Sequence, residues 1–333
     1  MKTLAIVILN YNGKKHLQTY LPSVVECSHG HDIIIVDNGS LDDSIPFLNA
    51  NFSGVKLIQL VKNVGFAQGY NDGLEKIKGQ YEHYLLLNSD VEVTSGYLSP
   101  LLSRIAGPSI AAVQPKILSH TNKTRFEHAG ASGGFLDRNG FPFCRGRIFD
   151  ACEADQGQYD NAIPVFWASG ACLLIKSALY HEANGFDGSF FAHMEEIDLC
   201  WRLQHNGYQI WVEPSSTVYH LGGGTLSYES NTKVFLNFRN NLYMLAKNES
   251  GFWPGKIFIR MVWDGLAGVQ FLLKGKVALL YQVLKAHGAF YVALPKLISQ
   301  RPSKKNTALD RYKGNIVIEY FLKKKNKYSD LNA

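Results

Sequence analysis

The chain has 333 residues, of which 46% are apolar and 19% are charged, a composition that excludes a disordered or low-complexity protein. Five scattered cysteines without C-x-x-C spacing argue against a zinc site or a disulfide framework, and favour a reducing compartment. The formal net charge of +6 is uneven, because residues 252–333 hold 15 Lys and Arg against 4 Asp and Glu. This basic segment indicates an anionic partner, either a membrane or a nucleic acid.

Strand and helix patterns alternate over residues 1–90. Apolar runs predict strands at Leu4–Leu9, Ile33–Val36, Val55–Leu60 and Tyr84–Leu87, and the segments between them predict helices at Lys14–Glu26, Asp42–Asn51 and Phe66–Lys78. The first run is too short for a signal peptide, so we expect a buried strand there. Strands separated by helices imply a parallel sheet, and ligands bind beyond the carboxyl ends of such strands. The candidate binding segments are therefore the polar turns Asn10–Gly13, Asp37–Ser40, Asn63–Gly65 and Asn88–Asp90.

The middle of the chain is less periodic. Residues 125–164 are rich in Gly, Asp and aromatic residues, which predicts loops and short strands that shape a pocket. After them we expect a strand at Trp167–Ile175, a helix at Lys176–Ala183 and strands at Gln209–Val212 and Thr217–His220.

The basic segment contains apolar clusters between Lys256 and Ser299, but charged residues keep every uncharged run below the ~18 residues of a spanning helix. Amphipathic helices on a membrane surface and helices that pack on the first domain both fit this pattern. The lysines alternate with long aliphatic side chains rather than aromatic stacking platforms, which favours lipid over nucleic acid. We expect one domain over residues 1–250 and a basic helical region over residues 251–333.

Three carboxylates, Glu195, Glu196 and Asp198, stand at the start of a predicted helix among apolar neighbours. Acids at a helix start complement the helix dipole, which is a purely structural explanation. Carboxylates at the edge of apolar packing must also be paired, metal-bound or raised in pKa, which is typical of a catalytic site. Asp198 and Arg202 share one helical face and are expected to pair.

Four further residues are candidates for binding chemistry. Asp90 can hold a divalent cation against a diphosphate or simply close a turn, and Asp37 can bind a ribose hydroxyl or form an Asx-turn. His220, which precedes Gly222-Gly223-Gly224-Thr225, can ligate a metal or contact phosphate. Arg239 can bind phosphate oxygens or an acidic partner within the fold. The chain has no G-x-G-x-x-G after the first strand and no G-x-x-x-x-G-K-[ST], which argues against dinucleotide-binding Rossmann enzymes and P-loop enzymes.

In order and spacing, these segments resemble the family 2 glycosyltransferases of the GT-A fold, most closely the rhamnosyltransferase-like branch. The resemblance covers about residues 1–245 and is carried by Val7–Gly13, Val36–Ser40, Asn63–Asn71, Leu86–Asp90, Ser169–Ala171, Gly185–Asp187, Glu195–Arg202 and His220–Thr225. It implies an α/β fold with a mainly parallel central sheet flanked by helices, followed by a C-terminal helical segment.

The resemblance also implies an activity: transfer of a sugar, with inversion, from a dTDP- or UDP-linked donor to a hydroxyl of a glycan or lipid-linked acceptor. Such an enzyme would serve cell-surface polysaccharide synthesis at the cytoplasmic face of the membrane. The residues that would bind the nucleotide sugar are Asn10, Asn12, Asp37, Asn38, Asn63, Gly65, Asn71, Asn88 and Arg239. Asp90 and His220 would hold Mg²⁺ or Mn²⁺. The catalytic base would be Glu196 first and Glu195 second, with Asp198 in the same catalytic group.

Two positions depart from the family pattern. The metal-binding triplet is Asn88-Ser89-Asp90, without its first acid, and Glu195-Glu196 stands where the family has Glu-Asp. Two alternatives therefore stay open. One is a nucleotidyltransferase that makes a nucleotide sugar, although the turn after the first strand offers only two lysines for a triphosphate. The other is a catalytically silent carbohydrate- or membrane-binding protein on the same fold.

Overall fold

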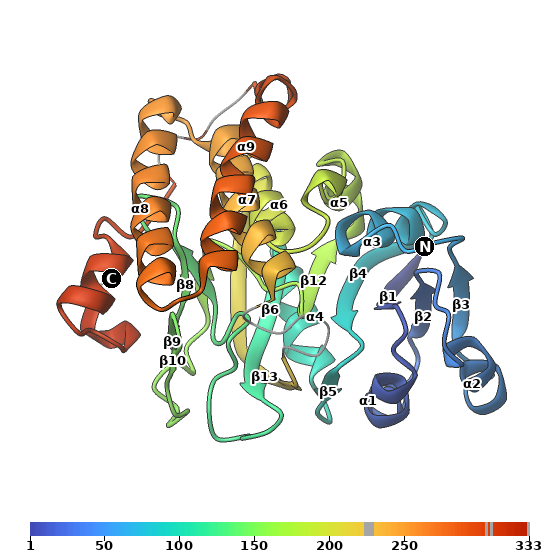
Figure 1. The fold of residues 1–333 in the computed structure, drawn as a ribbon. Helices are drawn as coiled ribbons and strands as arrows, with labels where there is room; N and C mark the ends of the chain where they lie inside the picture. Colours follow the sequence, from blue (N-terminus) through green and yellow to red (C-terminus); the bar gives the residue numbers. More distant parts are fainter. Residues whose placement is uncertain (223–229, 304–305, 307–308, 332–333) are drawn as a thin grey trace.

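The computed structural model describes residues 1–222, 230–303, 306 and 309–331 (Figure 1). Over residues 1–90 strands and helices alternate as the sequence predicts. They are β1 (Lys2–Asn10), α1 (Lys14–Cys27), β2 (Asp32–Asp37), α2 (Ser44–Asn51), β3 (Lys56–Gln59), α3 (Phe66–Glu75) and β4 (Tyr81–Asn88). Strands β4, β1, β2 and β3 pair in this order and in parallel.

These strands are continuously apolar because helices cover both faces of the sheet. Successive side chains alternate between the faces, so Val7 and Ile34 join one core while Ile8 and Ile35 join the other. Helix α3 packs in the first core and α1 in the second. Two helices are shorter than predicted, since α2 begins at Ser44 and α3 ends at Glu75.

The register brings the predicted binding turns to one edge. Asn10 pairs with Asp37, and Leu9 pairs with Asn88, so the carboxyl ends of β1, β2 and β4 lie level with each other. The polar residues after the strands therefore lie side by side.

The second half of the main sheet is mixed. Its elements are β5 (Val91–Val93), α4 (Leu98–Ile105), β6 (Ile110–Ser119), β11 (Ile163–Val165), β12 (Cys172–Lys176), α5 (Ser177–Glu182), a short 3-10 helix (Gly188–Phe190), α6 (Glu195–His205) and β13 (Gln209–His220). Strand β12 runs antiparallel between β4 and β6, whereas β13 runs parallel to β6. In the described part of the chain the sheet has nine strands, ordered β11-β13-β6-β12-β4-β1-β2-β3 with β5 beside β13.

Two predicted strand boundaries in this half are wrong. The strand expected from Trp167 begins only at Cys172, because residues 169–171 form a turn in which the Cys172 N–H bonds the Ser169 carbonyl at 3.3 Å. The two strands expected at 209–212 and 217–220 are one strand, β13, with an irregularity in its pairing between Glu213 and Thr217.

Residues 125–164 do form loops and short strands. Strands β7 (Gly134–Leu136), β8 (Pro142–Cys144), β9 (Arg147–Ile148) and β10 (Ala151–Cys152) make a second, antiparallel sheet in the order β10-β9-β8-β7. The end of the chain returns to this sheet, with a π-helical turn (Ile318–Leu322) and a 3-10 turn (Tyr328–Leu331) (Figure 1). Ile316 and Leu331 share a small core with Phe143 and Ile148.

Three long helices complete the fold: α7 (Asn231–Asn248), α8 (Trp253–Leu273) and α9 (Val277–Ser299). Helices α8 and α9 stand at the opposite end of the molecule from β2 and β3 (Figure 1). Ile257, Phe290 and Leu297 belong to the same core as Leu242 of α7, so the basic region packs on the first domain. By length and composition alone, α9 is the one helix among the described residues that could cross a membrane.

Candidate active site

At the ends of β1 and β2, the residues proposed to hold a nucleoside bond each other. The Asn10 amide donates to Asp37 Oδ1 at 3.0 Å and to Ser40 Oγ at 3.2 Å, and the Ser40 N–H donates to Asp37 Oδ2 at 2.9 Å. Asn12 joins the same turn by accepting from the Leu41 N–H at 2.7 Å. Asp37 is 1% exposed, so its buried carboxylate holds the turn in shape through these hydrogen bonds. Asn10 Oδ1 is buried and has no hydrogen-bond partner among the described residues.

Asn38 connects this turn to the segment Asn63–Gly65. Its amide donates to Asn63 Oδ1 at 3.1 Å and to the Gly65 carbonyl at 3.0 Å, while its oxygen accepts from the Val64 N–H at 3.1 Å. Gly65 has a φ of 89°, and a Cβ there would lie 2.5 Å from the ring of Phe191. This position therefore requires glycine.

Asp90 and His220 lie together at the same edge of the sheet. His220 Nε2 is 3.2 Å from Asp90 Oδ1, and the other ring nitrogen, Nδ1, is 3.2 Å from Glu127 Oε2. All three side chains are buried. Burial disfavours the charged imidazole, but Asp90 and Glu127 outweigh it and raise the pKa of His220 to about 10. Burial likewise opposes ionisation of Asp90 and Glu127, yet the adjacent imidazolium lowers the pKa of both carboxyls.

Asp90 and His220 would be the protein ligands of a divalent cation of the Mg²⁺ or Mn²⁺ kind, once the His220 imidazolium had lost its proton. Among the described residues no set of three or more His, Cys, Asp and Glu side chains is arranged to hold a metal. Asn88 lies beside Asp90 and His220, with its amide nitrogen 3.5 Å from His220 Nε2. Ions such as Mg²⁺ are commonly held by one or two protein ligands plus substrate phosphates and waters. An imidazole with a carboxylate also suits Mn²⁺.

The two glutamates at the start of α6 have buried carboxyl oxygens and no neutralising partner among the described residues. Oε2 of Glu195 and Oε2 of Glu196 have no hydrogen-bond partner within the described part of the chain. Burial and the neighbouring Glu196 raise the pKa of Glu195 well above its ordinary value. Burial raises the pKa of Glu196 to about 7. Glu196 is the more accessible of the two, since Glu195 is 4% exposed while Glu196 is half-buried.

Asp198 differs from these glutamates because it is surrounded by cations. It is paired with Arg202 at 2.8 Å, as predicted, and with Lys247 of α7 at 3.0 Å, and it accepts from the Asn248 amide at 2.7 Å. Burial opposes its charge, but Lys247 and Arg202 lower the pKa of Asp198. The carboxylate thus joins α6 to α7 and is not available to take a proton.

One turn, residues 169–171, lies between Asn88 and Glu196. The Ala171 carbonyl accepts from the Asn88 N–H at 3.0 Å, and a Cβ placed on Gly170 would lie 4.0 Å from Cβ of Glu196. On the other side, the N–H groups of Phe66 and Ala67 bond the Phe191 carbonyl at 2.7 and 3.2 Å. The segment 63–67 is thereby tied to the loop that precedes the glutamates.

Two candidate residues are bonded within the fold. Asn71 bonds Phe186 and Tyr180 through both ends of its amide, which ties α3 to the turn after α5. Arg239 donates to the carbonyls of Ser189 and Phe190 instead of presenting its guanidinium to a phosphate. Residues 223–225 of the glycine motif lie outside the described residues.

Sequence reasoning missed Glu127 and Asn240. Glu127 stands in the aperiodic stretch, where no local pattern signals a partner for His220. Asn240 adjoins Arg239, but the loop that its amide bonds lies about 50 residues away in the sequence.

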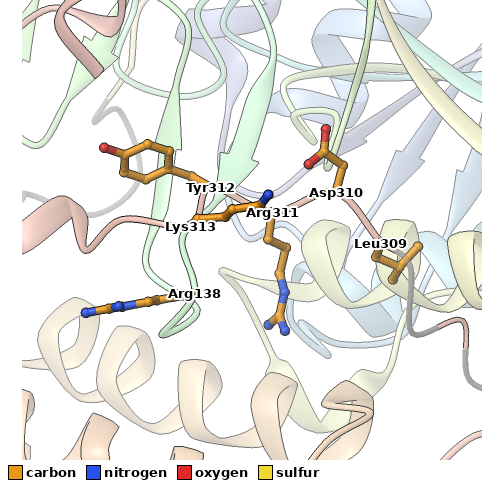
Figure 2. Close-up of a pocket in the computed structure, with 6 residues that line it drawn as sticks. All are labelled: Arg138, Leu309, Asp310, Arg311, Tyr312 and Lys313. Carbon is orange, nitrogen blue, oxygen red and sulfur yellow. The ribbon is translucent and has the colours of Figure 1, made fainter. Parts of the chain in front are cut away.

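A separate hollow of about 440 Å³ lies beside the end of the chain (Figure 2). Its lining residues are Arg138, Leu309, Asp310, Arg311, Tyr312 and Lys313. Arg311 is paired with Glu249 at 2.8 Å, and none of the carboxylates of the site lines this hollow. The hollow is therefore distinct from the candidate active site.

Known proteins with similar sequences are glycosyltransferases. The sequence model of Glycosyl transferase family 2 matches residues 5–154. The N-acetylglucosaminyl-diphospho-decaprenol L-rhamnosyltransferase of Mycobacterium tuberculosis is 23% identical over 75% of this chain and 86% of its own length. The low-salt glycan biosynthesis hexosyltransferase Agl10 of Haloferax volcanii is 24% identical over 74% of this chain and 75% of its own length.

Among solved structures, GalNAc-T7 with UDP, GalNAc and Mn²⁺ superposes with a TM-score of 0.59 at 14% identity. The match covers 92% of this chain, which spans 59% of that protein. The sequence match and the fold together indicate a glycosyltransferase with the GT-A fold. Its sequence is similar to family 2 glycosyltransferases of the rhamnosyltransferase-like kind.

Proposed function

We propose that this glycosyltransferase moves a hexose, with inversion, from a nucleotide-diphosphate sugar to a hydroxyl of a lipid-linked glycan in cell-surface polysaccharide synthesis. The observation that carries the proposal is the buried Glu195–Glu196 pair, held against the turn that bonds Asn88 beside Asp90 and His220. Acceptor activation and leaving-group stabilisation are the two functions that this reaction requires. The proposed acceptor follows the mycobacterial relative, whose name specifies a diphospho-decaprenol substrate.

Glu196 is our choice of base. Two adjacent buried carboxyls do not ionise together readily, and the one with the lower pKa ionises first. That residue is Glu196, with a pKa of about 7, while Glu195 stays protonated beside it. Glu196 takes the proton of the acceptor hydroxyl as its oxygen attacks the anomeric carbon, and the nucleoside diphosphate leaves from the opposite face.

Asp90 and His220 would hold Mg²⁺ or Mn²⁺. The bound cation would stabilise the charge that develops on the diphosphate. The turn of Asn10, Asn12, Asp37 and Asn38 would lie under the nucleoside, with Asn63 and Gly65 alongside. The solved GalNAc-T7 structure, which contains UDP and Mn²⁺, supports a metal-bound nucleotide on this fold.

A membrane surface is the partner we propose for helices α8 and α9. Ile257, Arg260 and Asp264 of α8 face inward, whereas large apolar side chains on the opposite faces are exposed. Those on α8 are Phe258, Ile259, Val262, Leu266, Val269, Leu272 and Leu273, and those on α9 are Val277, Tyr281, Leu284, Tyr291, Val292 and Ile298. An apolar stripe on a basic hairpin is typical of a helix pair that lies in the headgroup region of anionic lipids.

The activity test is nucleotide release from a panel of dTDP-, UDP- and GDP-sugars with a polyprenyl-diphosphate-linked acceptor. We expect release with one donor, dependent on Mg²⁺ or Mn²⁺ and lost in Glu196→Gln. Pyrophosphate formation from a nucleoside triphosphate would instead identify a nucleotidyltransferase. Metal-dependent nucleotide binding without any transfer would identify a catalytically silent protein.

The membrane test is sedimentation with lipid vesicles. We expect binding to vesicles of phosphatidylglycerol but little binding to phosphatidylcholine, and loss of binding in the double variant Leu266→Asp, Val292→Asp. A matched control is Leu41→Asp, which also changes an exposed apolar residue but lies outside the hairpin. Equal binding of both variants would contradict the proposal.

A further inference from the structure

The loop in front of the two glutamates has an unfavourable backbone. Phe191, His193 and Met194 have φ angles of 66°, 71° and 72°, in the left-handed region that residues with a Cβ rarely adopt. Met194 is the residue that immediately precedes α6, and its carbonyl accepts from the Asp198 N–H at 2.9 Å. Such a backbone persists only where its surroundings hold it, and strained segments of this kind cluster at functional sites.

One buried amide holds this loop. The Asn240 side chain is 0% exposed, and its nitrogen donates to the carbonyls of Phe190, Ala192 and His193 at 2.9, 2.8 and 2.8 Å. Each of these carbonyls belongs to the residue directly before a left-handed residue. A single side chain therefore bonds the backbone at every strained position of the loop.

Arg239 fixes the orientation of that amide. Its Nε donates to Asn240 Oδ1 at 2.9 Å, which leaves the amide nitrogen facing the loop. Its Nη2 donates to the carbonyls of Ser189 and Phe190 at 2.9 and 3.0 Å. The guanidinium lies 5.2 Å from the ring of Phe235 and 5.0 Å from that of Tyr243, so the planar group is itself held by packing.

We infer that Asn240, oriented by Arg239, is a positioning residue that holds the strained loop and thereby aims Glu195 and Glu196 at the sugar-transfer site. This inference rests on the proposed function, because it assumes that one of these glutamates is the base. The far side of the loop is anchored at the donor-binding segment, where the Phe191 carbonyl accepts from the Phe66 N–H. The clamp therefore sets the placement of the base relative to the donor.

The test compares Asn240→Asp with Asn241→Asp. Asn241 is the next residue of α7, 1% exposed, and donates to the Gly140 carbonyl at 3.2 Å, so it controls for changing a buried amide. In Asn240→Asp a carboxylate oxygen replaces the donor that faces three carbonyls. We expect kcat to fall at least 30-fold, with the donor KM within threefold of wild type and the midpoint of the kcat–pH profile moved. Asn241→Asp should lower the melting temperature comparably but leave kcat within threefold.

A second measurement needs no substrate. Amide hydrogen exchange across residues 188–198 should accelerate in Asn240→Asp and not in Asn241→Asp. If Asn240→Asp does not fold, Arg239→Lys, which keeps the charge but loses the planar fork, should give the same faster exchange and a smaller fall in kcat. Unchanged exchange and kcat in the folded variants would overturn the inference. Faster exchange in Asn240→Asp, together with full activity of both Glu195→Gln and Glu196→Gln, would instead refute the proposed base and leave the clamp intact.

Discussion

The pH dependence of turnover tests the proposed base most directly. Burial moves the pKa of Glu196 from an ordinary value near 4.5 to about 7, so its carboxylate is the minor form below neutral pH. For a single base, kcat then falls tenfold per pH unit below the midpoint and reaches about one tenth of its plateau near pH 6. Turnover falls on the acidic side because Glu196 acts as a base and only its ionised carboxylate accepts the proton.

Removing the base should lower kcat by about 10²–10⁴-fold. Glu196→Gln should therefore lose most of its turnover, and the acidic limb of the kcat–pH profile near pH 7 should disappear. Glu195→Gln should retain that limb, because Glu196 raises the pKa of Glu195 whereas burial is what raises the pKa of Glu196. A matched control is Glu182→Gln, which changes an exposed glutamate at the end of α5.

The assay is initial-rate nucleotide release at saturating donor and acceptor between pH 5 and 9, with melting temperatures recorded at each pH. A wild-type midpoint near 4.5 would refute the argument from burial. If the acidic limb of the kcat–pH profile persists in Glu196→Gln but disappears in Glu195→Gln, the catalytic base is Glu195.

Three further predictions concern the metal site, a glycine and the hairpin. Glu127→Gln should weaken Mn²⁺-dependent nucleotide binding by about 10–100-fold in calorimetry, because the carboxylate orients His220; unchanged affinity would remove Glu127 from the site. Gly65→Ala should destabilise the protein by about 2–4 kcal/mol in denaturant unfolding, since it combines a positive φ with overlap on Phe191. Gly79→Ala, which has a φ of 75° and open space, should cost only about 1–2 kcal/mol, and equal losses would contradict the overlap. Asp264→Ala should cost about 3–5 kcal/mol because it leaves Arg260 buried without its ion pair at 2.8 Å, and a loss below about 1 kcal/mol would show that the pair is not needed.

The local pattern of apolar residues in the sequence was sufficient to predict the parallel part of the sheet. The apolar runs of β1, β2 and β4 are buried on both faces, and their carboxyl ends place Asn10, Asp37 and Asn88 at one edge, as predicted. The pairing of Asp198 with Arg202 also follows from helical spacing and is confirmed at 2.8 Å.

The local sequence pattern could not predict the strand order and direction in the mixed half of the sheet. Nothing in the sequence of β12 indicates that it runs antiparallel between β4 and β6, because strand order depends on contacts between distant segments. The same limit applies to two polar residues that were expected to bind the donor. Arg239 and Asn71 have the chemistry of ligand contacts, but the carbonyls and hydroxyl that they bond become neighbours only in the folded chain.

The return of the chain end to the small sheet has a consequence for biosynthesis. Ile316 N–H bonds Asp137 Oδ2 at 3.0 Å, and Tyr312 N–H bonds the Leu136 carbonyl at 2.9 Å, so partners far apart in the sequence close this part of the core. Such distant pairings form late, because the entropy of closing a long loop is lost before the contacts compensate for it. During translation, Phe143 and Ile148 must wait for residues 312–331 to leave the ribosome. A nascent chain stalled after α9 would therefore expose an apolar sheet, a form that chaperones bind and that aggregates readily.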